Sequence, residues 1–158
     1  MMNRQVRMID LIDQMENMFS GHPWYGQTWI ESLERIPVDR INFRLAKGPS
    51  IASLLEHVVI WREYVVSKLH GDTGAHMEPG MDWSEEEISD TAWQELVRRL
   101  VESQQELLEG LSELPASELQ ETVPGLAYSW NFMLQGLIDH DAYHLGQINL
   151  LTKQVISA

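Results

Sequence analysis

In Leu137-Ile138-Asp139-His140-Asp141-Ala142-Tyr143-His144-Leu145-Gly146-Gln147, two histidines lie one helical turn apart on a row of residues that is otherwise mostly apolar. The row advances by alternating steps of four and three residues: Met133, Leu137, His140, His144, Gln147, Leu151. This spacing is typical of the stripe that a helix turns toward the interior of a bundle. Three consecutive polar groups on such a stripe are costly unless a partner satisfies them.

A divalent metal ion would satisfy them, because imidazoles at positions i and i+4 can converge on one ion. The alternative is a pair of core histidines bonded to Tyr, Asp or water, and the spacing favours the metal. A metal site needs a third ligand, and His57 is the best candidate because it alone lies within an apolar helix body. Its alternative is a histidine at the solvent edge. The other candidates are His22, His70 and His76.

Helical periodicity continues over the rest of the chain, and Gly and Pro mark the breaks. It predicts helices over residues 4–19, with a continuation over 27–36, then 50–69, 84–114 and 129–155. Ser50 and Ser84 are predicted N-caps, although a capping box at 53–56 offers another start for the second helix. Strand patterns are nearly absent. Amphipathic helices of this length predict an all-α four-helix bundle, since each helix needs the others to cover its apolar stripe.

The connection predicted over residues 71–83 affects the topology. Its 13 residues can span roughly 43 Å when extended, whereas the helix over 50–69 is about 30 Å long. A crossover that leaves the second and third helices parallel is therefore available.

Composition narrows the class of protein. A length of 158 residues predicts one domain over 1–158. A net charge of −13 argues against nucleic acid or an anionic membrane as a partner. The absence of Cys excludes disulfides, a Cys nucleophile and thiolate metal sites. Neither a secretory signal nor a membrane span is apparent, which predicts a cytoplasmic protein.

Three other chemistries fit the residues poorly. The segment from His140 to His144 resembles the zinc-protease motif H-E-x-x-H, but it has Asp in place of Glu and no further ligand pattern follows. A di-iron carboxylate bundle needs two E-x-x-H motifs, and Asp141-x-x-His144 is the only remote match. No G-x-S-x-G nucleophile motif occurs.

Three segments together resemble the DinB/YfiT-like superfamily of metal-binding four-helix bundles. They are the helix that carries His57 between Ser50 and Trp61, the motif His140-x-x-x-His144-x-x-Gln147, and Pro23-Trp24-Tyr25-Gly26. The resemblance implies a divalent ion held by His57, His140 and His144. It also implies an up-down-down-up bundle and frequent homodimers. Relatives include transferases and isomerases that use low-molecular-weight thiols, and others are assigned only as metal-dependent hydrolases.

We therefore expect a metal-dependent enzyme, a thiol S-transferase or a hydrolase, that acts on a small molecule with zinc, nickel or iron. The alternative is a non-catalytic, metal-stabilised dimeric module that binds a small molecule. The lack of Cys suits an external thiol, because no internal thiol competes for the metal. Gln147 is the candidate catalytic residue, placed to orient bound water or substrate, and its alternative role is to support the histidines.

The remaining aromatic and apolar residues lead to two further expectations. Trp24, Tyr25 and Trp61 are candidate walls of the pocket, whereas Asp141 and Tyr143 are expected to pack or to support the ligands. Six Trp and eight Met exceed what one small bundle readily hides. This excess predicts a twofold homodimer.

Overall fold

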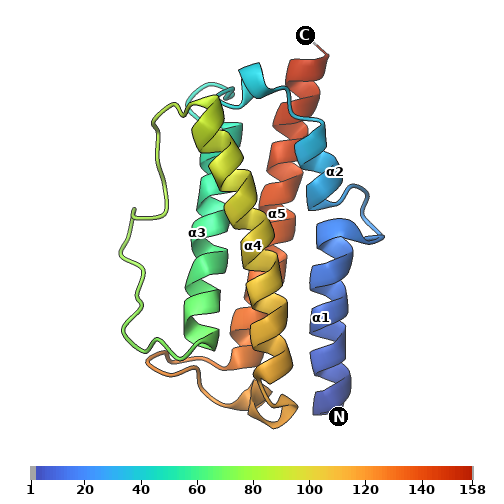
Figure 1. The fold of residues 1–158 in the computed structure, drawn as a ribbon, viewed down its shortest axis with the longest axis vertical. Helices are drawn as coiled ribbons and strands as arrows, with labels where there is room; N and C mark the ends of the chain where they lie inside the picture. Colours follow the sequence, from blue (N-terminus) through green and yellow to red (C-terminus); the bar gives the residue numbers. More distant parts are fainter. Residues whose placement is uncertain (1–2, 158) are drawn as a thin grey trace.

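The computed structural model describes residues 3–157, and its regular secondary structure is helical (Figure 1). Its four long helices are α1 (Arg4–Ser20), α3 (Ile51–Leu69), α4 (Asp90–Glu113) and α5 (Trp130–Ile156). A short helix, α2 (Trp29–Glu34), continues the first arm, and two 3-10 turns, η1 (Val38–Arg40) and η2 (Ala116–Gln120), lie in the connections. Within residues 3–157 no strand forms beyond one isolated bridge. The predicted all-α bundle is confirmed.

Serine side chains set the start of α3 and of α5. The hydroxyl of Ser50 accepts a hydrogen bond from the backbone N–H of Ser53, and that of Ser129 accepts one from Phe132. These caps satisfy N–H groups that have no partner inside the helix. The alternative start at Ser53 is not used, because its hydroxyl donates to the carbonyl of Ser84 at 2.6 Å.

The predicted start of the third long helix at Ser84 is wrong. Helix α4 begins at Asp90 with Ser89 as its N-cap. The residue before this N-cap, Ile88, is bonded to a distant segment. The side-chain amide of Asn42 donates to the carbonyl of Ile88 at 2.9 Å and accepts from the backbone N–H of Ile88 at 3.1 Å. Because these backbone groups are bonded to a distant side chain, they do not join the helix.

The connection over residues 70–89 is consequently longer than predicted. It runs along the side of the bundle, from the C-terminal end of α3 to the end at which α4 begins (Figure 1). Helix α3 is buried on most of its surface and packs most extensively against α4 and α5. This packing puts α3 beside α5, the two helices that carry the predicted metal ligands.

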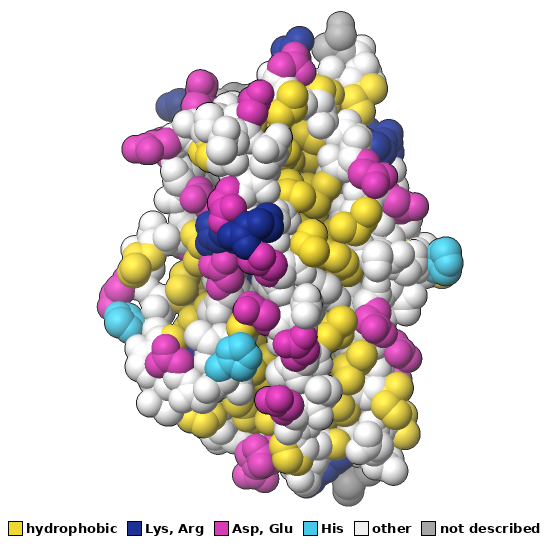
Figure 2. Space-filling view, in the orientation of Figure 1, with side chains coloured by type: hydrophobic (Ala, Val, Ile, Leu, Met, Phe, Trp, Pro, Cys, Tyr) yellow, Lys and Arg dark blue, Asp and Glu magenta, His cyan; other side chains and the backbone are white. Residues whose placement is uncertain are grey.

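The surface is acidic, as the composition predicts. Figure 2 shows more acidic than basic side chains on the visible face, in keeping with the net charge of −13. Apolar side chains are also exposed, among them Phe132, Tyr143 and Leu150 on α5. Among the described residues, no helix combines the length and hydropathy that crossing a membrane requires.

Candidate metal centre

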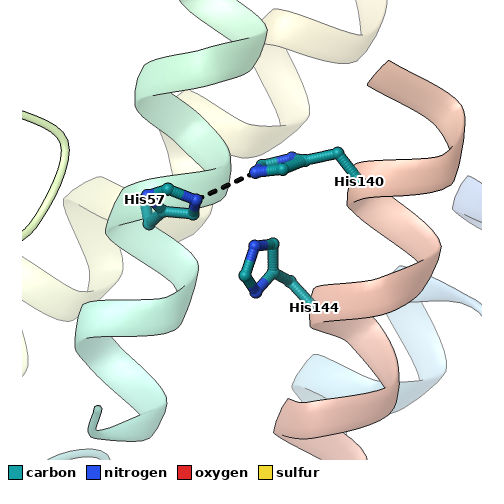
Figure 3. A group of neighbouring side chains, drawn as sticks. All are labelled: His57, His140 and His144. Atoms are coloured by element: carbon teal, nitrogen blue, oxygen red, sulfur yellow. Dashed lines mark hydrogen bonds between the residues drawn. The ribbon is translucent and has the colours of Figure 1, made fainter. Parts of the chain in front are cut away.

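Three histidines from two helices meet between α3 and α5. His57 of α3 points toward His140 and His144 of α5 across the space between the helices (Figure 3). One ring nitrogen of each residue lies within 4.8 Å of the others. His57 and His144 are buried, and His140 is half-buried. The structure therefore brings together the three histidines that the sequence singles out.

The three other candidate histidines lie elsewhere. His70 is the C-cap of α3, and His22 and His76 are exposed. Trp61 lines a pocket next to His140, as expected. Trp24 and Tyr25 do not wall the histidine centre: both are exposed and line a separate pocket against α1, because the break before α2 turns outward.

The ring of His57 is oriented by the 70–89 connection. Its Nδ1 lies 3.0 Å from the carbonyl oxygen of Asp82. Since a carbonyl oxygen only accepts, Nδ1 carries the proton and donates it. In a neutral His57, Nε2 therefore has no proton and carries a lone pair. This atom lies 2.9 Å from Nε2 of His140. Trp83 stacks on the same ring, with centroids 3.9 Å apart, and fixes its plane.

Gln147 orients the ring of His144. Its Oε1 accepts a hydrogen bond from Nδ1 of His144 at 2.6 Å, and its Nε2 donates to the hydroxyl of Tyr143 at 3.4 Å. In a neutral His144, Nε2 consequently has no proton and carries a lone pair as well. This contact supports the alternative role of Gln147, and its contact with a substrate stays a prediction.

The ring of His140 lacks one partner within the described part of the chain. Because Nε2 of His57 is an acceptor, Nε2 of His140 donates to it, so a neutral His140 leaves Nδ1 without a proton. That Nδ1 is buried without a hydrogen-bond partner, and so is Oδ1 of Asp141, 3.6 Å away. A cation at the Nε2 atoms would displace the shared proton, and Nδ1 beside a carboxylate is a favourable place for it.

These features fit a divalent ion. Tetrahedral zinc, at about 2.0–2.1 Å from each ligand, separates its nitrogens by roughly 3.3 Å. The Nε2 atoms of His57 and His140 are 2.9 Å apart, slightly less than this value. One ring nitrogen of each of the three histidines lies within 4.8 Å of the others, an upper limit that exceeds it. Neutral imidazoles suit zinc, nickel and iron alike, so the donor set alone does not select the metal.

Burial keeps two of the rings neutral. The pKa of His144 is lowered to about 4, first by burial and then by the neighbouring ring of His140. Burial also lowers the pKa of His57, although its hydrogen bond to the Asp82 carbonyl opposes the shift. Both rings are therefore neutral at pH 7, which is the form that binds a metal.

For the metal-free protein, we predict that the free energy of unfolding falls as the pH drops from about 6.5 to about 4. In this window the unfolded chain binds a proton at His144 that the folded chain does not. The loss from His144 reaches at most about 3 kcal/mol and stops increasing below its folded pKa of about 4. Urea unfolding at pH 7, 5.5 and 4 measures it. H144Q, which has no ionisable group there, should show a shallower slope, of which His57 keeps a part because its pKa is lowered too. An equal slope in both proteins would contradict the assignment.

A buried ion pair stands next to the histidines. Arg62 and Asp141 are each 1% exposed, and the guanidinium of Arg62 donates to the Asp141 carboxylate. It also donates to the hydroxyl of Ser103 at 2.9 Å and to the side-chain oxygen of Gln104. The network joins α3, α4 and α5, and Asp141 is adjacent to His140 in sequence. Asp141 therefore supports the packing of the helices, as expected of it, and fixes the turn of α5 that carries His140.

Sequence reasoning missed Asp82, Trp83 and Arg62. Asp82 and Trp83 lie in the 70–89 connection, whose path cannot be predicted from the helical periodicity of apolar residues. Arg62 did leave a signal, because it stands between Val58 and Val65 on an apolar face where an unpaired cation would be costly.

The family model of the DinB superfamily matches residues 26–148, a range that includes all three histidines. No curated protein and no solved structure matches the chain significantly. The group of His57, His140 and His144 fits a metal-binding protein. Because the matched range runs from before α2 to near the end of α5 and covers most of the chain, the chain belongs to the DinB superfamily.

Proposed function

We propose that this protein is a metal-dependent enzyme that holds one divalent ion through Nε2 of His57, His140 and His144. One observation carries the proposal. The Nδ1 of each ring faces an oxygen: the carbonyl of Asp82, a carboxylate oxygen of Asp141 and the amide oxygen of Gln147. The Asp82 and Gln147 oxygens select the Nδ1–H tautomers of His57 and His144. The Asp141 carboxylate, 3.6 Å from Nδ1 of His140, favours moving the His140 proton from Nε2 to Nδ1 when a cation takes the three Nε2 lone pairs.

The open side of the centre supports a catalytic role. A divalent ion with three protein ligands keeps a position for water or substrate and lowers the pKa of a water or thiol bound there. His140 is half-buried and borders a pocket, so a small molecule can reach the centre. The protein supplies no Cys of its own.

We assign the reaction to thiol S-transfer or to hydrolysis of a small molecule. In the transfer, the sulfur of an external low-molecular-weight thiol bonds to an electrophilic carbon, and the thiol proton leaves with the displaced group. In the hydrolysis, water takes the place of the thiol. Both reactions need a neutral nucleophile to lose a proton near the centre. The family resemblance and the absence of Cys support the transfer.

A turnover screen tests the proposal. Protein loaded with zinc, nickel or iron is incubated with a panel of small thiols plus an alkylating electrophile, and separately with esters and amides. We expect turnover in one panel that disappears on chelation and in H140A. A fully loaded protein that binds these compounds without turnover would instead favour the alternative, a non-catalytic small-molecule binding module stabilised by the metal.

We also propose that the protein is a twofold homodimer. Apolar side chains exposed on α5 outside the pocket that borders His140, Tyr143 and Leu150, support an interface on the outer face of the bundle that leaves this pocket accessible. Sedimentation equilibrium at micromolar concentration should give about twice the 18.2 kDa chain mass. A single species at the chain mass would remove the dimer and leave the metal centre untouched.

Three further assignments complete the proposal. The course of the 70–89 connection supports an up-down-down-up order of the long helices. The contiguous apolar core supports a single domain over residues 1–158. We assign the protein to the cytoplasm on the basis of its sequence.

A further inference from the structure

A pocket with a volume of about 240 Å³ lies between α3 and α5, beside the histidine centre. Trp61 and Val65 line it from α3, and Phe132 and Leu137 line it from α5. His140 belongs to both the pocket and the histidine group. Phe132 is 65% exposed, so the pocket is open to solvent on that side. A molecule that enters here meets the centre at His140.

The lining selects for an uncharged group. None of the described residues that line the pocket is Asp, Glu, Lys or Arg. The indole N–H of Trp61 already donates to Asp82 at 3.0 Å and is not free for a ligand. An ionic group would lose its hydration here without gaining a counter-charge, whereas a hydrocarbon group gains from leaving water.

The volume limits the size of that group. A cavity of about 150 Å³ accepts benzene, and sites for drug-sized molecules measure about 300–1,000 Å³. A pocket of about 240 Å³ lies between these values. It therefore accommodates a substituted aromatic ring or a branched alkyl chain, which is one part of a substrate.

We infer that the pocket binds an uncharged hydrocarbon group, aromatic or branched alkyl, that the substrate carries within a few bonds of its reacting atom. The position of the reacting atom rests on the proposed function, because His140 is where the pocket touches the centre. The binding of the hydrocarbon group does not require the metal, since the other walls are mostly apolar and come from α3, from α5 and from Tyr128 in the connection before α5.

Gly136 offers a way to close the pocket. It lines the pocket in α5, and a Cβ at this position would meet no atom within 4 Å. G136L therefore places its Cβ in open space at the wall of the pocket, where its side chain competes with a ligand for room, and it removes a helix-weakening glycine. Gly146 is a matched control, because it lies in the same helix, has equally open surroundings and is not part of the pocket.

Nuclear magnetic resonance titration of the full chain tests the inference, with the indole N–H of Trp61 as reporter. The probes are benzyl alcohol and its charged counterparts, benzylamine and benzoate. We expect saturable binding of benzyl alcohol at least tenfold tighter than that of either ion. G136L should weaken this binding at least tenfold, and G146L should leave it within twofold. Absence of a saturable shift, or equal binding by G136L, would overturn the inference.

Repeating the titration with H144A separates this inference from the proposed function. His144 does not line the pocket, so H144A should bind benzyl alcohol as the unmodified protein does. If the unmodified protein binds benzyl alcohol but fails to bind metal or to turn over substrate, the result counts against the proposed function alone. If the unmodified protein binds metal and turns over substrate, but G136L binds benzyl alcohol normally, the result counts against the pocket inference alone.

Discussion

H144A is expected to abolish stoichiometric binding of a divalent ion, with a loss of affinity of more than about 100-fold. Loss of a partner that only orients a ligating histidine typically costs about 10–100-fold, and removal of a ligand should exceed this. His144 is buried and its ring is neutral, so its Nε2 is available to the ion without losing a proton first, and Ala offers no ligand atom in its place. Titration of the purified apoprotein with Zn²⁺ by calorimetry measures the change.

Two variants bracket this result. Q147A keeps all three ligands but removes the amide oxygen that holds Nδ1 of His144, so we expect a loss of about 10-fold or slightly more. H76A changes an exposed histidine outside the group, and its affinity should equal that of the unmodified protein. Full metal content in H144A, or an equal loss in H76A, would mean that the site is elsewhere.

R62M is expected to lower the free energy of unfolding by about 3–5 kcal/mol. The substitution leaves the carboxylate of Asp141 buried without its counter-charge, and it also removes hydrogen bonds to Ser103 and Gln104. Equilibrium urea unfolding measures the loss. The double variant R62M/D141L should recover most of it, because an apolar pair of similar size carries no desolvation penalty.

The matched control is R98M in the neighbouring helix. Arg98 also pairs with two carboxylates, those of Glu95 and Glu102, but all three side chains are about half exposed. Water and salt screen such pairs, so R98M should leave the urea midpoint unchanged. If R62M behaved like R98M, or if the double variant were no more stable than R62M, the buried pair would not be a structural requirement.

Much of the fold follows from local patterns in the chain. The apolar stripes locate the long helices, and Ser50 and Ser129 mark two of their starts, because capping is a contact between near neighbours. The start of α4 was not predictable in this way. Ser84 and Ser89 are both followed by acidic residues and look equivalent in sequence. The choice between them depends on Asn42, which bonds to the backbone of Ile88 from a distant segment.

The candidate site likewise contains residues that local sequence patterns predict and residues that they do not. The heptad-like row of α5 identifies His140 and His144, and the apolar surroundings of His57 identify the third member. Asp82 and Trp83, which orient the ring of His57, could not be predicted, since their positions depend on the path of a long connection. Asp141 falls between Leu137 and Leu145 on buried positions of α5, so its pairing with a buried cation was open to prediction.

X-ray absorption of the metal-loaded protein tests the central claim most directly, because it reports the atoms around the ion. The account predicts a zinc spectrum with three imidazole nitrogens at about 2.0–2.1 Å and one further light ligand. H57A, loaded under the same conditions, should lose that signature. A spectrum dominated by carboxylate oxygens, or one that is identical in the unmodified protein and in H57A, would contradict the three-histidine centre.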